Sequence, residues 1–104
     1  MATSKEFHDY VLECLTRAGE VRTRKMMGEY LLYYRNKLIG DICDNVLLVK
    51  ITSGSEHLLP DAERVYPYEG SRSLMLAVDN VEDTERMREL METIYAELPE
   101  VKNK

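Results

Sequence analysis

The stretch MMGEYLLYYRNKLIGDICDNVLLVK, residues 26–50, decides the fold, because it places two turn signals between runs of apolar and aromatic residues. Arg35-Asn36-Lys37 separates a predicted strand over 29–34 from a returning strand over 38–43. Asp44-Asn45 makes a second tight turn, since both residue types tolerate positive φ, before an apolar strand over 46–51. The stretch therefore predicts an antiparallel meander.

Apolar side chains occur on both faces of this meander. Strand alternation puts Leu31 and Tyr33 on one face and Tyr30 and Leu32 on the other. The strand over 46–51 is almost continuously apolar, which is typical of a strand buried on both faces. Helices can cover one face, and the remaining chain is too short to cover the second. We therefore expect a homodimer that buries the second face.

Helices are predicted at both ends of the chain. Ser4 can cap a helix whose apolar residues recur at helical spacing as far as Gly19. Residues 79–83 offer N-cap side chains for a second helix, which ends at Pro99. Its apolar positions are Met87, Leu90, Met91, Ile94, Tyr95 and Leu98.

The segments between these helices and the meander complete the predicted fold. Residues 21–27 form an edge strand whose charged side chains discourage pairing with stray chains, and Gly28 permits the following turn. Residues 55–59 form a short helical turn, 61–70 a loop and 74–78 a last strand. The prediction is a two-layer α+β fold. Its antiparallel sheet has about four to five strands, flanked by N- and C-terminal helices, in one domain over 1–104 with an ordered core of about 4–99.

Composition narrows the classes of function. The net charge is −5 and the sequence pI is about 5.0, which disfavours binding of nucleic acid or anionic membranes by bulk electrostatics. Two Cys supply neither a disulfide framework nor a metal site, and we expect reduced thiols in a cytoplasmic protein. No stretch approaches the roughly 18 apolar residues of a membrane span. We predict no metal, no cofactor and no membrane partner.

Five separated motifs resemble the TfoX/Sxy N-terminal domain family. They are residues 26–30, 33–37, 47–50, 67–70 and 97–99, which read MMGEY, YYRNK, LLVK, PYEG and ELP. The resemblance runs from about Ser4 to Pro99 and is to stand-alone members, without the C-terminal helical domain of full-length competence regulators. It implies a small two-layer α+β fold. It also implies a bacterial, non-enzymatic interaction or regulatory domain with a protein partner in transcription regulation.

The candidate binding residues cluster around the first hairpin. They are Arg22, Arg24, Lys25, Glu29, Tyr30, Tyr33 and Tyr68. One alternative is direct nucleic-acid binding through the basic and aromatic patch between Arg22 and Lys37. Another is a small-molecule or enzymatic site that uses Glu29 and nearby Tyr residues. The favoured interpretation pairs Glu29 with a cation of the neighbouring strand, namely Arg22, Arg24 or Lys25.

Other reactive side chains have simpler interpretations, and we predict no catalytic residue. Cys14 lies on the apolar stripe of the first helix and is expected to be buried. Cys43 adjoins Asp44, whose charge would raise the thiol pKa. His8 and His57 are expected to be solvated surface residues. A charge at residue 41 implies an exposed or paired strand position.

Overall fold

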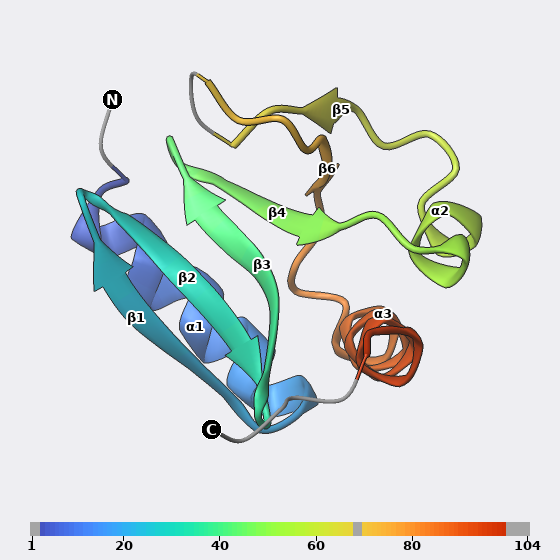
Figure 1. Ribbon diagram of the computed structural model, residues 1–104. Helices are drawn as coiled ribbons and strands as arrows, with labels where there is room; N and C mark the ends of the chain where they lie inside the picture. Colours follow the sequence, from blue (N-terminus) through green and yellow to red (C-terminus); the bar gives the residue numbers. More distant parts are fainter. Residues whose placement is uncertain (1–2, 68–69, 100–104) are drawn as a thin grey trace.

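The computed structural model describes residues 3–67 and 70–99, which form one six-stranded sheet with helices on one face (Figure 1). The strand order is β1-β2-β3-β4-β6-β5, with every neighbouring pair antiparallel. The elements are α1 (Lys5–Ala18), β1 (Val21–Met26), β2 (Glu29–Tyr34), β3 (Lys37–Cys43), β4 (Val46–Lys50), α2 (Ser53–Leu58), β5 (Arg64–Val65), β6 (Met75–Val78) and α3 (Thr84–Glu97). The predicted α+β class is confirmed.

The two long helices begin and end at the predicted signals. The Ser4 hydroxyl accepts a hydrogen bond from the Phe7 N–H at the start of α1, and the Gly19 N–H donates to the Leu15 carbonyl at its end. The Asp83 carboxylate caps α3 in the same way. No helix within the described residues has the length and apolar character needed to cross a bilayer.

Tight turns join the first strands into hairpins. Met27 and Gly28 link β1 to β2 with φ of 53° and 86°, and Asp44 and Asn45 link β3 to β4 with φ of 51° and 59°. Positive φ at both central residues matches the twist of a two-residue hairpin. Met27 has no side-chain cover and is 97% exposed. The turns fix the register and hence the face on which each side chain lies.

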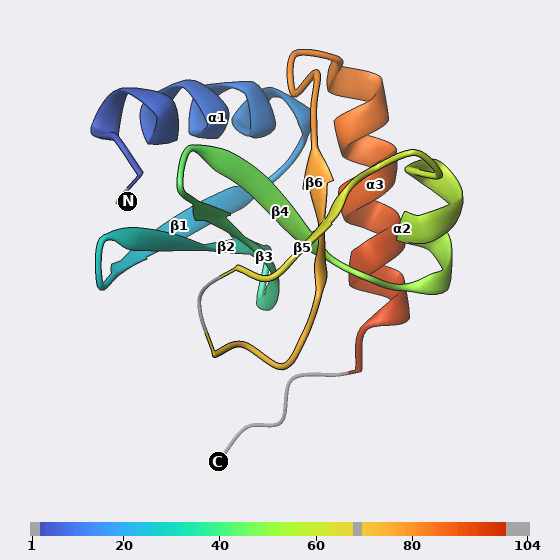
Figure 2. The same ribbon diagram turned by 90° about the horizontal axis from the view of Figure 1, so that it is seen from above.

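One face of the sheet packs against α1 and α3 and holds the main core. The most deeply buried side chains there are Val11, Leu15, Leu32, Ile39, Ile42, Leu47, Val49, Leu76, Met87, Leu90, Met91 and Ile94. Figure 2 shows α1 on one side of the sheet and the segment 70–74, which leads into β6, on the other. We call the side of the sheet opposite α1 and α3 the far face.

Several strand ends differ from the predicted ranges by one residue, and larger differences occur at β5 and α2. The sheet gains β5, which sequence patterns missed because it is only two residues long and lies just before Pro67. The short helix starts at Ser53, since Thr52 and Ser55 form a reciprocal capping box there. The remaining chain also covers part of the far face, which the sequence argument did not anticipate. Val65 and Ala77 pack there beside buried Met75.

Strands β3 and β4 approach closely at Gly40. A Cβ built on Gly40 would lie 2.1 Å from the Leu48 carbonyl oxygen, which is main chain and cannot swing aside. The register of β3 against β2 also shifts between Leu32 and Tyr33, beside this glycine. The close approach therefore requires a residue without a side chain.

We expect Gly40→Ala to lower the free energy of unfolding by about 2–3 kcal/mol, because the strands must separate to admit the methyl group. Urea titration followed by circular dichroism measures this loss. Gly70→Ala is the control, since nothing lies within 4 Å of a Cβ there. Its cost of about 1 kcal/mol comes only from its positive φ. Equal losses in the two variants would contradict the close approach of β3 and β4.

Candidate functional site

The far face carries the exposed apolar side chains of the sheet. Two contacts show which side of the sheet each β1 side chain lies on. Thr23 bonds to His8 of α1 and therefore faces the helices. Its neighbour Arg22 lies on the opposite side, where it stacks on Tyr33. By alternation the far face carries Arg22, Arg24, Met26, Leu31, Tyr33, Leu38, Asp41, Cys43, Val46, Leu48 and Lys50. Met26 is 46% exposed and Val46 is 36% exposed.

The far face is covered at one end and open at the other. Cys43, Leu48 and Met75 are buried in a small second cluster over β3, β4 and β6. Toward β1 the side chains are more accessible, with Leu31 and Leu38 only partly buried. The chain therefore supplies its own cover for the β4 end and leaves the β1 end to solvent.

Adjoining hollows run across this open part. A hollow of about 990 Å³ lies between Leu31, Asp41 and Lys50 on the sheet and the segment 70–75 that passes over it. A second hollow of about 490 Å³ shares Leu31 and Asp41 and extends to Glu29. Sequence reasoning missed the contribution of the segment 70–75. In this segment Leu74 is 37% exposed beside the hollows.

Asp41 lies near the centre of the hollows. It pairs with Leu31 on β2 and Leu48 on β4 and is half-buried. Burial raises the pKa of its carboxyl group, Lys50 on β4 opposes this shift, and Glu29 adds to it. The expectation of an exposed or paired position is thus corrected, because Asp41 is partly desolvated and no ion pair of its carboxylate occurs within the described residues.

Glu29 at the start of β2 binds Thr3, which precedes α1, through hydrogen bonds. One of its oxygens, Oε1, accepts hydrogen bonds from the Thr3 hydroxyl at 2.7 Å, the Thr3 N–H at 3.3 Å and the Asp44 N–H at 3.1 Å. The Ser4 N–H adds a bond to the Asn45 side chain. Among the described residues no cation of β1 pairs with Glu29, so the predicted ion pair is wrong. The carboxylate is engaged by backbone and hydroxyl donors instead.

We expect Glu29→Ala to destabilise the protein by about 1–3 kcal/mol, because Thr3 and Asp44 lose a shared charged acceptor. Thermal unfolding followed by circular dichroism measures the loss. Glu29→Gln keeps an acceptor oxygen and serves as the matched control, with a smaller expected loss. If the Ala variant unfolds at the wild-type temperature, Glu29 does not fasten the N-terminal segment.

Tyr30 lies on the helix side, against His8. The two rings stack with centroids 3.9 Å apart and planes 25° apart. His8 is 9% exposed, and its ring nitrogens contact Asp9 at 2.9 Å and the Thr23 hydroxyl at 2.7 Å. The prediction of a solvated histidine is wrong for His8, since α1 presses it onto β1 and β2, while His57 is exposed as predicted. Tyr30 therefore belongs to the core side rather than to the far face.

The predicted basic and aromatic patch is divided between two sides of the sheet. Tyr34 is buried and donates a hydrogen bond to Glu92 of α3, which also accepts one from Arg35 at 2.8 Å. Lys37 is buried and donates to the carbonyl groups of Tyr95 and Leu98. These side chains attach α3 to the β2–β3 hairpin. They lie away from the far face.

The rest of the predicted binding set stays near β1. The Arg22 guanidinium lies 4.3 Å from the centroid of the Tyr33 ring, and Arg24 is exposed on the same side. Lys25 is exposed and, by alternation, lies on the opposite side from Arg24. Tyr68 lies outside the described residues. The structure thus brings Arg22, Arg24 and Tyr33 together.

Neither cysteine has the surroundings of an activated nucleophile. Both are buried free thiols. Burial raises the pKa of Cys43 to about 12, with further contributions from Asp41, Glu29 and Asp44. The predicted direction of the shift is confirmed, but its largest cause is desolvation and not the charge of Asp44.

We expect the Cys43 thiol to react slowly with iodoacetamide at pH 8 in the native protein. A rise in pKa from 9.0 to about 12 lowers the thiolate fraction at that pH about a thousandfold. Mass spectrometry of a Cys14→Ala variant isolates this site, and the same variant in urea is the control. Equal native and denatured rates would contradict the buried position of Cys43.

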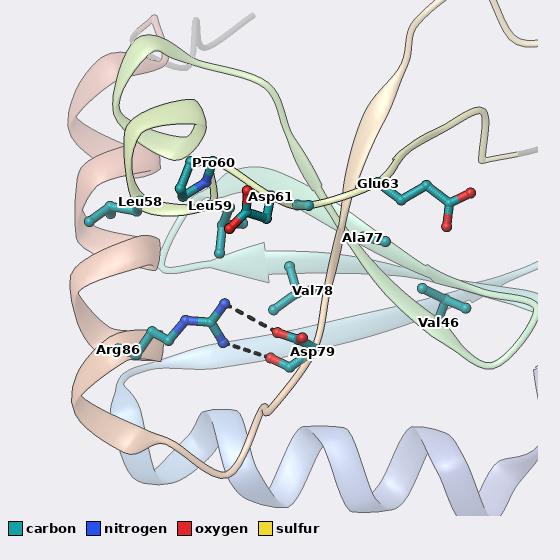
Figure 3. Close-up of a pocket in the computed structure, with 11 residues that line it drawn as sticks. Val46, Leu58, Leu59, Pro60, Asp61, Glu63, Ala77, Val78, Asp79 and Arg86 are labelled. Atoms are coloured by element: carbon teal, nitrogen blue, oxygen red, sulfur yellow. Dashed lines mark hydrogen bonds and ion pairs between the residues drawn. The ribbon is translucent and has the colours of Figure 1, made fainter.

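A further hollow of about 480 Å³ lies at the other end of the sheet, between α2, β4, β6 and α3. Figure 3 shows Arg86 reaching from α3 to Asp79 at the end of β6. The Arg86 guanidinium donates to the Asp79 carbonyl at 2.8 Å and to its carboxylate at 3.2 Å. Asp61 and Glu63 also line the hollow. Because the Asp79 carbonyl and carboxylate both accept hydrogen bonds from Arg86, we assign Arg86 a structural role.

The fold and this surface define the protein as an α+β domain with a helix-covered antiparallel sheet whose far face is partly open. Comparison with known proteins adds a relative. The chain is 33% identical over 99 residues to an uncharacterized 12.7 kDa protein in the trpE 5′ region of Spirochaeta aurantia. The match covers 95% of this chain and 86% of the relative. The chain therefore belongs to the family of that spirochaete protein. No family model and no solved structure matches it.

Proposed function

We propose that this protein is a non-enzymatic interaction domain of the TfoX N-terminal type, which pairs with a second copy of itself through the far face. The observation that carries the proposal is the group of exposed apolar side chains around adjoining hollows on that face. Met26 and Leu74 line these hollows and are 46% and 37% exposed. A contiguous apolar surface on a small domain is typical of an association site.

A second copy is the favoured occupant because the far face carries charges of both signs. Asp41 and Lys50 lie on neighbouring strands, and Arg72 lines the same hollow. In a two-fold dimer the same surface of each copy forms the interface. Acidic groups of one copy can therefore lie against basic groups of the other when the surface carries both. Burial of Met26 and Leu74 would supply apolar contact area around these charges.

The motifs quoted above support a regulatory role in the bacterial cytoplasm. On this proposal the protein acts as an adaptor whose partner is a component of transcription regulation, and the paired far faces leave α1 and α3 accessible. The arrangement of Glu29 and Cys43 favours an adaptor over an enzyme, since the carboxylate is engaged by Thr3 and the thiol is held protonated.

We expect wild-type protein at micromolar concentration to have the mass of two chains in light scattering. The double variant Met26→Lys with Leu74→Lys places charges on the apolar surface and should have the mass of one chain. Tyr10→Lys is the control, because Tyr10 is 41% exposed on α1 and bonds to Glu82, which a lysine can still approach. That variant should remain dimeric. A monomeric wild-type protein would overturn the proposed pairing.

The adaptor role is tested separately with the tagged chain in its native cell. Capture of an identified transcription regulator by the wild-type chain supports the role. Recovery of copies of the chain alone contradicts it.

A further inference from the structure

The edge of β1 is a second surface that the proposed pairing of far faces does not use. Strand β1 is the first strand in the sheet order, so one side of its backbone has no neighbouring strand in the described residues. The opposite edge is β5, which has only two residues. An open edge of six residues is a template for an added strand.

The hydrogen-bond pattern shows which backbone groups of β1 point outward. The Arg35 N–H donates to the Glu20 carbonyl at 2.9 Å, so residue 20 is bonded to the adjacent strand. In an antiparallel pair such bonded residues alternate with outward-facing ones. Residues 22, 24 and 26 therefore continue the ladder to β2. Val21, Thr23 and Lys25 direct their N–H and C=O groups away from it.

The side chains along this edge are cationic in a protein whose net charge is −5. Arg22 and Arg24 flank the open backbone on the far-face side, and Lys25 flanks it on the helix side. None of the three forms an ion pair within the described residues, and Arg22 is held by its contact with Tyr33. Their charges are thus available to side chains of an added strand.

We propose that β1 binds an extended acidic segment of a protein partner by strand addition. The open N–H and C=O groups of Val21, Thr23 and Lys25 supply the main-chain bonds. Arg22, Arg24 and Lys25 select carboxylates at the neighbouring positions of the added strand, because opposite charges in adjacent strands attract. The partner is recognised by extended backbone and negative charge together.

Charge also argues against a second copy of β1 as the occupant. In an antiparallel pair of β1 strands the outward-facing residues of the two copies lie opposite one another, so a pair centred on Thr23 places Arg22 opposite Arg24 of the second copy. Like charges directly opposite one another destabilise a strand pair. A nucleic acid would satisfy the cations but not the outward N–H and C=O groups in a regular ladder. An acidic strand satisfies both.

The test uses the full chain and two capped peptides of alternating Val and Glu or alternating Val and Lys, with oligothymidylate as a third probe. Titration calorimetry measures affinity, and NMR measures amide hydrogen exchange. We expect the Glu peptide to bind and the Lys peptide not to bind. Bound Glu peptide should slow exchange at the Thr23 and Lys25 amides. It should leave Arg22 and Arg24 unchanged, since their N–H groups already donate to β2.

Two substitutions at one position separate the backbone from the charge. Lys25→Gln and Lys25→Pro both remove the cation, but only the proline removes the outward N–H. Proline is tolerated at an edge-strand position whose N–H faces solvent. Circular dichroism of both variants checks that the fold is kept. We expect the Pro variant to bind the Glu peptide at least about tenfold more weakly than the Gln variant. Arg22→Glu with Arg24→Glu should abolish binding of the Glu peptide.

Each remaining outcome overturns the proposal. Absence of Glu-peptide binding rejects it. If the Glu peptide binds but amide exchange at Thr23 and Lys25 does not slow, the peptide binds through surface charge and not by strand addition. Oligothymidylate binding tighter than that of the Glu peptide assigns the edge to nucleic acid. A chain mass that changes with Lys25→Pro assigns it to self-association.

Discussion

The register of the β2–β3–β4 meander is the constraint on which the rest of the structure depends. Because side chains alternate along a strand, a slip of one residue would move Leu32, Leu47 and Val49 from the helix side to the far face. The turn at Asp44 and Asn45 prevents such a slip, since both residues hold the positive φ that a two-residue hairpin requires. The helices α1 and α3 pack on the face that this register makes largely apolar.

The ends of the elements are fastened to one another by polar contacts around this core. Glu29 joins Thr3 to the turn between β3 and β4, and Lys37 joins the start of β3 to the end of α3. These contacts occupy several of the charged groups that sequence motifs had offered as candidates for a site. What remains accessible is apolar surface on the far face and the cationic edge of β1. We propose both as surfaces for association, the first through apolar contact and the second through main-chain hydrogen bonds and charge.

Much of the architecture could be read from local patterns. The caps at Ser4 and Asp83 and the turn at Asp44-Asn45 depend on residues within a few positions of one another, so the sequence predicts them well. The candidate site was harder to predict. Tyr30 and Tyr33 differ by three positions, yet one stacks on His8 and the other lies under Arg22. Strand alternation separates them, while the partner of each ring comes from another element.

The sequence by itself determined the α+β class, the long helices, the hairpins and the apolar character of both faces of the sheet, because each follows from spacing and turn chemistry. Only the tertiary structure decided the burial of His8, the partners of Glu29, and the packing of Val65 and Ala77 beside Met75 on the far face. These depend on which distant segments meet. Such contacts follow from how the helices, β5 and β6 pack around the sheet, which no local pattern encodes.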